Sequence, residues 1–449
     1  MVHYALSEKF RNEFHFMCLD TLIPHAKPGD IVVPPFTGEE FQAEAFHWLS
    51  MFAHWALQQG LSADHTVLFA STHVKHILTS YQVTSWSDFI HDFFRHYEIE
   101  GDVKFAQWYW KKASHVHITW FSYRELRACT NSFSELKLVG NGKVGLVYQG
   151  FLADDQKVAV KKYKEVTGHH LGDVLYEVFL HRSLPKSSHL VKLIGFSSFE
   201  HDPLLVYEYI AGGNLDQHLH GTIAGEKLTW DERLNIAIDV ASAITELHYN
   251  CKFPIYHRDV KSTNILLDHH KRAKLSDFGI AAAVSHEKQR TSCHTKVKGS
   301  YGYTDPAYES SGTLSDTSDV YSFGVVLLEL ITGLRAGEFT RSKTFLPDLV
   351  NEMTNLELLE DIVDKAIWRP CSEDPNNHCL DCLKAFVQDV VELALKCCNS
   401  EPKSRPNIGE VTQKLKEIHL EQKMCDTNIS DSMERENPGR ERVIRRGRH

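Results

Sequence analysis

The sequence of 449 residues lacks a long apolar run and lacks an excess of basic residues. Its most apolar stretch, VYSFGVVLLELITG from Val320 to Gly333, carries a glutamate and is shorter than the roughly 20 residues of a membrane helix. The formal net charge of −10 leaves no basic surplus to neutralise nucleic-acid phosphates. We therefore expect no membrane insertion and no nucleic-acid partner.

Targeting and disulfide features are also missing. The opening stretch, MVHYALSEKFRNEF, is charged and has no apolar core of a signal peptide, and Val2 stands where N-myristoylation requires glycine. The ten cysteines are scattered along a long chain, which is typical of free thiols in a reducing compartment. These features predict a cytoplasmic location.

The chain divides into three segments by composition. Residues 1–120 are rich in tryptophan, histidine and phenylalanine, and apolar residues recur there at helical spacing, as in the stretch that opens with the capping box Thr37 and Glu40. This predicts a small, mostly helical module. Residues 121–423 run from a strand-rich to a helix-rich half and form the main domain. Residues 424–449 have few large apolar side chains, which predicts a disordered tail.

A glycine-rich stretch, GNGKVGLVYQG, opens the main domain with the pattern G-x-G-x-x-G at Gly140, Gly142 and Gly145. This pattern alone fits a dinucleotide site, an ATP site of a protein kinase or an ordinary turn. A dinucleotide site requires a helix directly after the loop. Here the chain continues LVYQGFLADDQKVAVKKY, whose two β-branched runs and intervening turn predict a β-hairpin. The hairpin favours ATP.

The hairpin ends in VAVK, and its last residue, Lys161, is expected to contact the α- and β-phosphates. The downstream stretch DVLYEVFLHRSL predicts a helix that carries Glu177 as the ion-pair partner of Lys161.

Two motifs further on have the strongest chemical content: YHRDVKSTNILLD and AKLSDFGIA. They match H-R-D-x-x-x-x-N and D-F-G in full and in order. Asp259 is then the residue that accepts or orients the proton of the substrate hydroxyl, and Lys261 neutralises the transferred phosphoryl group. Asn264 and Asp277 supply oxygen ligands for Mg²⁺.

About 300 residues resemble a eukaryotic protein kinase, which implies an α+β, two-lobed fold with a β-rich N-lobe and a helical C-lobe. Lys261 and the hydroxyl of Ser300 are similar to those of serine/threonine kinases. The stretches FSYRELRACTNSFSE, LLVYEYIAGGNL and DVYSFGVVLLELITG resemble the Pelle/IRAK group and the related plant receptor-like cytoplasmic kinases. That group implies receptor-proximal signalling and makes the first 120 residues similar to a death-domain-type adaptor, an interaction module that contacts receptor or adaptor proteins.

The resemblance also implies the nucleotide contacts. It places a gatekeeper tyrosine at Tyr207. Adenine is expected to bind the backbone of Glu208 and Ile210. The side chains expected to pack around it are Val147, Ala159 and Leu266.

Regulation is implied by Arg258, which precedes the catalytic aspartate and can bind a phosphate on the activation segment. Thr295 fits that phosphate best, with Thr291 and Ser292 as further candidates. Asp319 is expected to anchor the catalytic loop.

One residue departs from the family pattern. The glutamate expected after the activation segment is Ala307, whereas its arginine partner is retained as Arg405. Either Glu309 substitutes for it or the activation segment is held more loosely. The second possibility supports an alternative function, a pseudokinase scaffold that acts through its N-terminal module.

Overall fold

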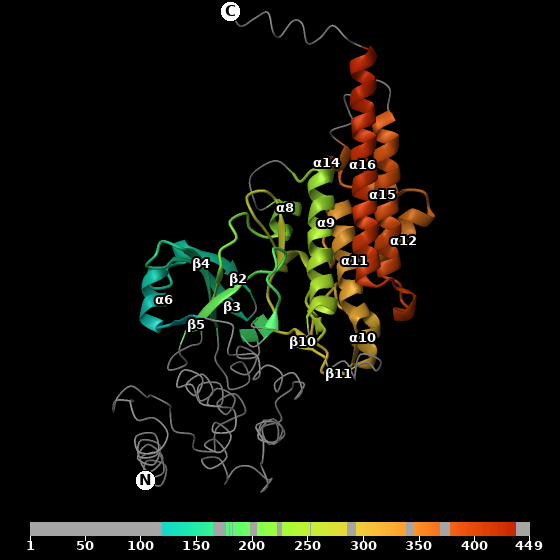
Figure 1. Ribbon diagram of the computed structural model, residues 1–449. Coiled ribbons are helices and arrows are strands. Elements are labelled where there is room, and N and C mark those ends of the chain that lie inside the picture. Colours follow the sequence, from blue (N-terminus) through green and yellow to red (C-terminus); the bar gives the residue numbers. More distant parts are fainter. Residues whose placement is uncertain are drawn as a thin grey trace, which may run out of the picture. The chain divides into compact units, whose positions relative to one another are not determined.

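The computed structural model describes residues 119–436, apart from 143, 165–176, 179, 182, 198–203, 222–226, 252, 285–292, 338–344 and 369–377 (Figure 1). The predicted helical module at 1–120 therefore lies outside the described residues, except for its last two positions. Two compact units are present. Unit 1 extends through position 184 and includes 192–209 and 282–285, and unit 2 contains the remainder.

Unit 1 is built on one six-stranded sheet in the order β1-β5-β6-β4-β3-β2. The pairs β2–β3, β3–β4, β4–β6 and β5–β6 are antiparallel, whereas β1 runs parallel to β5. The strands are β1 (Thr119–Phe121), β2 (Leu138–Asn141), β3 (Gly145–Phe151), β4 (Lys157–Tyr163), β5 (Leu193–Ser197) and β6 (Leu204–Glu208).

The predicted hairpin is β3–β4, and its alternating residues Val158 and Val160 are fully buried. They pack with Phe121 and Leu126, so that the residues just before the glycine loop belong to the same core. Leu126 lies on α6 (Tyr123–Cys129), which begins at the capping box formed by Ser122 and Glu125. The short helix η3 (Glu135–Lys137) then leads into β2.

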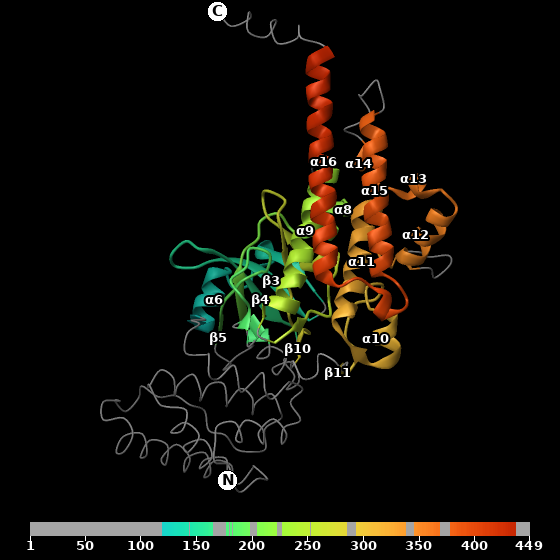
Figure 2. The same ribbon diagram turned by 45° about the vertical axis from the view of Figure 1, so that its right-hand side comes forward.

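Unit 2 is mostly helical. In Figures 1 and 2, α9, α11, α15 and α16 run side by side, in agreement with their contacts. The longer helices are α9 (Trp230–Thr245), α11 (Asp316–Thr332), α12 (Leu346–Asn355), α15 (His378–Cys397) and α16 (Ile408–Glu436). The shorter ones are α8 (Leu215–Leu219), η4 (Glu246–Asn250), η5 (Ser262–Asn264), α10 (Pro306–Ser311), α13 (Leu359–Ile362), α14 (Lys365–Trp368) and η7 (Pro402–Ser404). Short strands pair as β8 (Ile265–Leu267) with β9 (Ala273–Leu275) and β11 (Cys293–His294) with β12 (Thr313–Leu314).

Helix α11 is the centre of unit 2. All but two of its residues are buried, which explains why its sequence is apolar on every side. The apolar stretch noted above is this core helix. Across 119–436, outside the gaps given above, no helix is both long and apolar enough to cross a bilayer.

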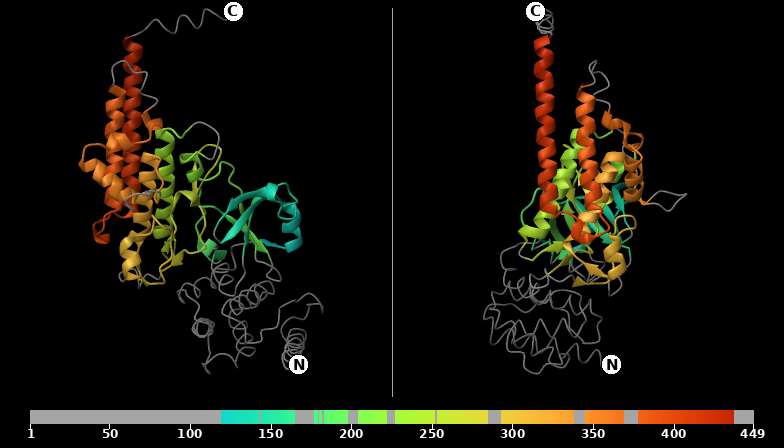
Figure 3. Two further views of the ribbon diagram at one scale, coloured as in Figure 1. Left: turned by 180° about the vertical axis from the view of Figure 1, so that it is seen from behind. Right: turned by 90° about the vertical axis from the view of Figure 1, so that its right-hand side faces the viewer.

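The structure corrects one predicted boundary. Helix α16 continues to Glu436, whereas a disordered tail was predicted to start at 424. Figure 3 shows the last turns of α16 projecting beyond α15. At the start of this extension, the hydroxyl of Thr427 donates to the carbonyl of Lys423 at 2.8 Å. Residues 437–449 lie outside the described part of the chain.

Candidate active site

Lys161 and Glu177 form the predicted ion pair in unit 1. Lys161 lies on β4, and its Nζ is 3.3 Å from Oε2 of Glu177. The hydroxyls of Tyr163 and Tyr207 donate to the same carboxylate at 3.1 Å and 2.5 Å. Glu177 is fully buried, and a buried charge is tolerated only when it is paired and hydrogen-bonded. The gatekeeper position Tyr207 was predicted, but its bond to Glu177 was not.

The glycine loop connects β2 and β3. Its backbone closes through a hydrogen bond from the amide of Gly142 to the carbonyl of Gly145 at 3.0 Å. A Cβ at Gly145 would lie 2.7 Å from the carbonyl oxygen of Lys162, so only glycine fits there. Gly140 lies on β2, where a Cβ would meet Val147 at 3.3 Å.

The residues predicted to bind adenine are divided between the units. Val147 pairs with Lys161 across β3–β4, and Ala159 pairs with Tyr207 across β4–β6. Glu208 ends β6, where its amide donates to the carbonyl of Lys192 at 3.0 Å. Their counterparts in unit 2 are Ile210 and, on β8, Leu266. Their adenine contacts stay predictions.

Asp259 is the centre of the catalytic loop in unit 2. Its Oδ1 accepts a hydrogen bond from the Ser300 hydroxyl at 2.6 Å. Its Oδ2 lies 2.7 Å from Nζ of Lys261 and accepts from Nδ2 of Asn264 at 2.9 Å. Lys261 also donates to the Ser300 hydroxyl at 2.7 Å. The structure thus brings the predicted residues Lys261 and Asn264 to the carboxylate of Asp259. The Ser300 hydroxyl occupies the place suited to a hydroxyl that loses its proton.

The magnesium ligands were predicted to be Asn264 and Asp277. The Nδ2 of Asn264 donates both to the Asp259 carboxylate and to the Asp259 carbonyl at 2.9 Å, so its amide oxygen is the atom suited to a hard cation. Asp277 has an exposed side chain and a backbone φ of 65°, an uncommon conformation for a residue other than glycine. An amide oxygen and a carboxylate fit a divalent metal.

Asp319 anchors the catalytic loop, as predicted. It lies in the first turn of α11, and its carboxylate accepts hydrogen bonds from the amides of His257 and Arg258, both at 2.8 Å. His248 Nε2 lies 2.8 Å from the same carboxylate. Burial raises the pKa of Asp319, but the hydrogen bonds and the charges of His248 and His257 outweigh it and hold the pKa below its ordinary value. The loop is therefore fixed by an ionised carboxylate.

Sequence reasoning missed a second anchor on α11. Glu329 is fully buried, and its Oε1 accepts from the hydroxyls of Tyr303 at 2.8 Å and Ser262 at 3.3 Å. Nε2 of His220 lies 3.8 Å from the same oxygen. Burial raises the pKa of Glu329 despite these partners. Ser262 lies three residues after Asp259, so Glu329 links the catalytic loop to the chain that follows the activation segment.

Thr295 lies near the arginine predicted to bind its phosphate. Nη1 of Arg258 is 3.4 Å from the Thr295 hydroxyl, which also lies 2.9 Å from the hydroxyl of Tyr308. The backbone amide of Thr295 donates to the carbonyl of Gly312 at 2.9 Å. The other candidates, Thr291 and Ser292, lie outside the described residues.

Glu309 was one of the two alternatives for the missing glutamate, and it was wrong, because Arg405 has another partner. The Nη1 and Nη2 atoms of Arg405 donate to the two carboxylate oxygens of Asp305 at 2.7 and 2.8 Å. Both side chains are buried, and the pair is bidentate. Asp305 also caps α10 by accepting from the amide of Ala307 at 2.9 Å. A carboxylate two residues before Ala307 therefore replaces the missing glutamate.

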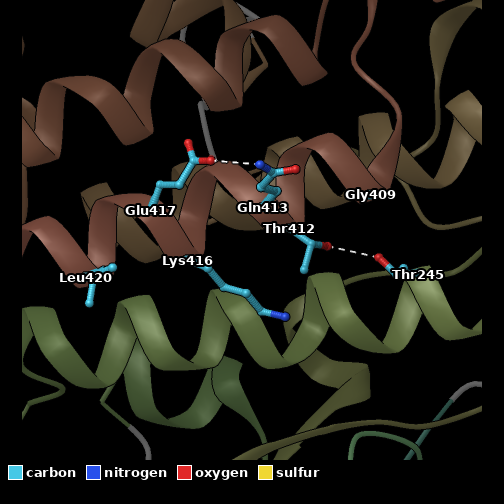
Figure 4. Close-up of a pocket in the computed structure, with 7 residues that line it drawn as sticks. All are labelled: Thr245, Gly409, Thr412, Gln413, Lys416, Glu417 and Leu420. Atoms are coloured by element: carbon cyan, nitrogen blue, oxygen red, sulfur yellow. Dashed lines mark hydrogen bonds between the residues drawn. The ribbon is translucent and has the colours of Figure 1, made fainter.

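Unit 2 also has a groove of about 500 Å³ between α9 and α16 (Figure 4). Two hydrogen bonds at 2.9 Å lie along it, one between the hydroxyls of Thr245 and Thr412 and the other from Gln413 to Glu417. Its lining contains none of the catalytic-loop residues, so it has no part in the chemistry.

The loop geometry around Asp259, the anchors on α11 and the Lys161–Glu177 pair define a protein kinase domain, and comparison with known proteins agrees. Residues 133–415 match the profile of the protein tyrosine and serine/threonine kinase family, and the chain belongs to this family. The predicted fold, a β-rich N-lobe followed by a helical C-lobe, is confirmed.

Similar curated proteins are plant receptor kinases. Wall-associated receptor kinase-like 18 of Arabidopsis thaliana is 39% identical over 302 residues, covering 66% of this chain and 36% of the relative. Wall-associated receptor kinase-like 10 of the same plant is 40% identical over 303 residues, which cover 66% of this chain and 37% of the relative. Wall-associated receptor kinase 3, also of this plant, is 36% identical over 313 residues, which cover 69% of this chain and 40% of the relative. The chain therefore spans less than half the length of these relatives.

Proposed function

We propose that the protein transfers the γ-phosphate of ATP to serine and threonine hydroxyls of protein substrates, with Mg²⁺ as the metal. The observation that carries this proposal is the arrangement around Asp259, whose carboxylate holds one serine hydroxyl at 2.6 Å together with Lys261 and Asn264. A bound magnesium ion would neutralise the charge of the phosphates through Asn264 and Asp277.

The proposed reaction is an in-line displacement. The substrate hydroxyl oxygen forms a bond to the γ-phosphorus, and the bond from this phosphorus to the β–γ bridging oxygen breaks, so that ADP leaves. The hydroxyl proton passes to the carboxylate of Asp259. Lys261 lies within reach of that carboxylate and of the bonded hydroxyl, where its charge stabilises the transferred phosphoryl group. Lys161 orients the α- and β-phosphates while Glu177 fixes its ammonium group.

The test compares the transfer of radiolabelled phosphate from ATP to a generic basic protein by three forms of the full chain. Asp259→Asn should lower the rate by a factor of at least about 10², because it removes the proton acceptor. The matched control, Asp361→Asn, changes an exposed aspartate on α13 and should transfer at the wild-type rate. Equal background in wild type and Asp259→Asn would overturn the proposal, and label on tyrosine alone in phosphoamino-acid analysis would overturn its serine/threonine part.

A scaffold that does not transfer phosphate is the second candidate. Ala307 favoured it, but Asp305 now accounts for Arg405. Signalling that is rescued by Asp259→Asn and lost on deletion of residues 1–120 would support the scaffold function.

We further propose that phosphorylation of Thr295 activates the enzyme in receptor-proximal signalling in the cytoplasm. The proximity of Thr295 to Arg258 supports the first part, and the names of the similar receptor kinases support the receptor-proximal role. The cytoplasmic location stays a prediction. Membership of the Pelle/IRAK group, the death-domain-type module and its adaptor partners stay predictions. A pull-down with residues 1–120 as bait tests the partners, and Thr295→Ala with mass spectrometry tests the phosphorylation site.

A further inference from the structure

Two lysines of unit 1 lie on one aromatic ring. Nζ of Lys137, on η3, is 5.4 Å from the ring centroid of Phe151, and Nζ of Lys157, on β4, is 5.9 Å from the same centroid. Nζ of Lys157 is also 4.1 Å from the ring centroid of Tyr209. Cations are attracted to the face of an aromatic ring within about 6 Å of its centroid. These four residues form a lysine–aromatic patch that holds two ammonium groups at one place.

The two positive charges of the patch have no negative partner. Within the described residues, neither Lys137 nor Lys157 forms an ion pair with a carboxylate. The hairpin turn between Phe151 and Lys157 contains Asp154, but its Oδ1 accepts a hydrogen bond from the amide of Gln156 at 3.1 Å. Two ammonium groups on one ring repel each other, so an anion bound between them would stabilise both.

The patch combines this charge with exposed apolar surface. Phe151 is 44% exposed, and Leu136, next to Lys137 on η3, is 94% exposed. Exposed apolar groups that gather at one place and are bordered by polar groups mark interaction sites. Lysine side chains that already lie on a ring also lose less conformational entropy when a ligand binds. The patch therefore fits a ligand that carries both an apolar side chain and negative charge.

The patch is separate from the proposed phosphate contact. Phe151 and Lys157 are paired across β3–β4, as are Val147 and Lys161. Side chains alternate along a strand, so these two pairs lie on the same face of the sheet. They are four residues apart, which is about 13 Å at 3.3 Å per residue. A ligand of the patch can therefore bind without occupying the position of the phosphates.

We propose that the lysine–aromatic patch binds an acidic segment of a partner protein. An apolar side chain of this segment contacts Phe151, and carboxylates on either side of it pair with Lys137 and Lys157. The surface has no part in the proposed phosphate transfer and adds a binding function to it. An anionic membrane is a poorer match, because lipid recognition uses clusters of about four to eight basic residues and the chain has a net charge of −10.

The test measures the binding of a fluorescein-labelled peptide to the full chain by fluorescence anisotropy, without nucleotide. The peptide has one central leucine flanked by glutamates, and the control peptide has glutamine in place of every glutamate. We expect the glutamate peptide to bind at least about tenfold more tightly at low salt. This difference should become smaller as the ionic strength rises, because exposed charges are screened.

Three variants assign the binding to the patch. Lys137→Gln combined with Lys157→Gln removes both charges and should weaken the binding of the glutamate peptide at least about tenfold, to the level of the glutamine peptide. Phe151→Ala removes the apolar contact and should weaken the binding of both peptides at least about threefold. The matched control is Lys164→Gln, which removes an exposed lysine of the same unit and should bind like the wild type.

The inference is overturned if the wild type binds neither peptide, if it binds both equally, or if the double lysine variant binds like the wild type. Binding to vesicles of phosphatidylcholine and phosphatidylserine without binding to the glutamate peptide would also overturn it, and would identify a membrane-binding surface instead. The double lysine variant should transfer phosphate at the wild-type rate, so a failure of this inference leaves the proposed kinase function unaffected.

Discussion

Asp305 neutralises a guanidinium that lies in the interior of unit 2. Its two oxygens bind Arg405 at 2.7 and 2.8 Å, and both side chains are almost completely excluded from solvent. Asp305→Ala would leave the arginine buried without a counter-charge, which costs about 3–5 kcal/mol. We expect the free energy of unfolding, measured by urea denaturation, to fall by that amount.

The control for this prediction is a pair on the surface. Glu360→Ala breaks the 2.7 Å pair with Lys384, in which the two side chains are 64% and 36% exposed, and should cost less than about 1 kcal/mol. Adding Ala307→Glu to Asp305→Ala should restore a large part of the lost stability, because it places a carboxylate at the position where the family pattern has glutamate. Equal losses in the surface and buried variants would contradict the role of Asp305.

The raised pKa of Glu329 predicts how the stability of the fold depends on pH. Burial raises its pKa above the ordinary value of 4.5 despite the bonds from Tyr303 and Ser262. A carboxyl group with a raised folded-state pKa stabilises the fold fully below its unfolded pKa, and this contribution is lost as the pH rises through the folded-state pKa. Glu329→Gln keeps a neutral side chain of the same shape. We expect this variant to unfold at the wild-type temperature near pH 4 and to become increasingly more stable than wild type as the pH rises above about 4.5.

Thermal unfolding followed between pH 4 and 8 measures this difference. Asp319 is a useful comparison on the same helix, because its pKa is lowered and its contribution to stability is therefore lost as the pH falls. A difference between Glu329→Gln and wild type that is constant over this pH range would show that Glu329 does not titrate differently on folding.

At the scale of elements, the segment before the family-matched region is part of unit 1. The match begins at residue 133, yet β1 and α6 precede it and contribute Phe121 and Leu126 to the sheet core. Gly195 allows the approach of β1, because a Cβ there would lie 2.2 Å from the carbonyl oxygen of Thr119. A kinase fragment that starts at residue 133 would lose this packing.

Two leucines test the importance of this segment. Leu126→Ala removes a fully buried side chain and should lower the free energy of unfolding by about 2–5 kcal/mol. Leu136→Ala changes a leucine on η3 that is 94% exposed, and should change stability by less than about 0.5 kcal/mol. If the two variants unfold at the same urea concentration, α6 is not part of the core.

The elements also show what could be predicted from sequence. Asp259, Lys261 and Asn264 lie within six residues, so their motif contains nearly all of the geometry that brings them together. Arg405 and Asp305 are separated by 100 positions, so the carboxylate that reaches the arginine is decided by tertiary packing, which no local motif contains. The extension of α16 was missed because the residues from 424 to 436 are mostly polar and have no apolar period to indicate a helix.

At the scale of the whole molecule, the two units contribute different groups to the proposed reaction. Lys161 and Glu177 belong to unit 1, whereas Asp259, Asn264 and Asp277 belong to unit 2. Binding of a nucleotide to the folded state stabilises the chain by about 2.7 kcal/mol when its concentration is 100 times the dissociation constant. The melting temperature with ATP, with and without Mg²⁺, therefore reports on each group separately from phosphate transfer.

We expect ATP with Mg²⁺ to raise the melting temperature of the wild type, and Lys161→Met to reduce this shift because it removes a phosphate contact. Asp277→Ala should remove only the part of the shift that depends on Mg²⁺, since it removes a metal ligand and leaves Lys161 in place. Asp259→Asn should retain the full shift although its transfer rate falls by a factor of at least about 10², because the Asp259 carboxylate acts on the substrate hydroxyl and not on the nucleotide. A full Mg²⁺-dependent shift in Asp277→Ala would contradict its role as a metal ligand. A wild type that shows the shift but no transfer would identify a nucleotide-binding scaffold, because the nucleotide would then bind without being used.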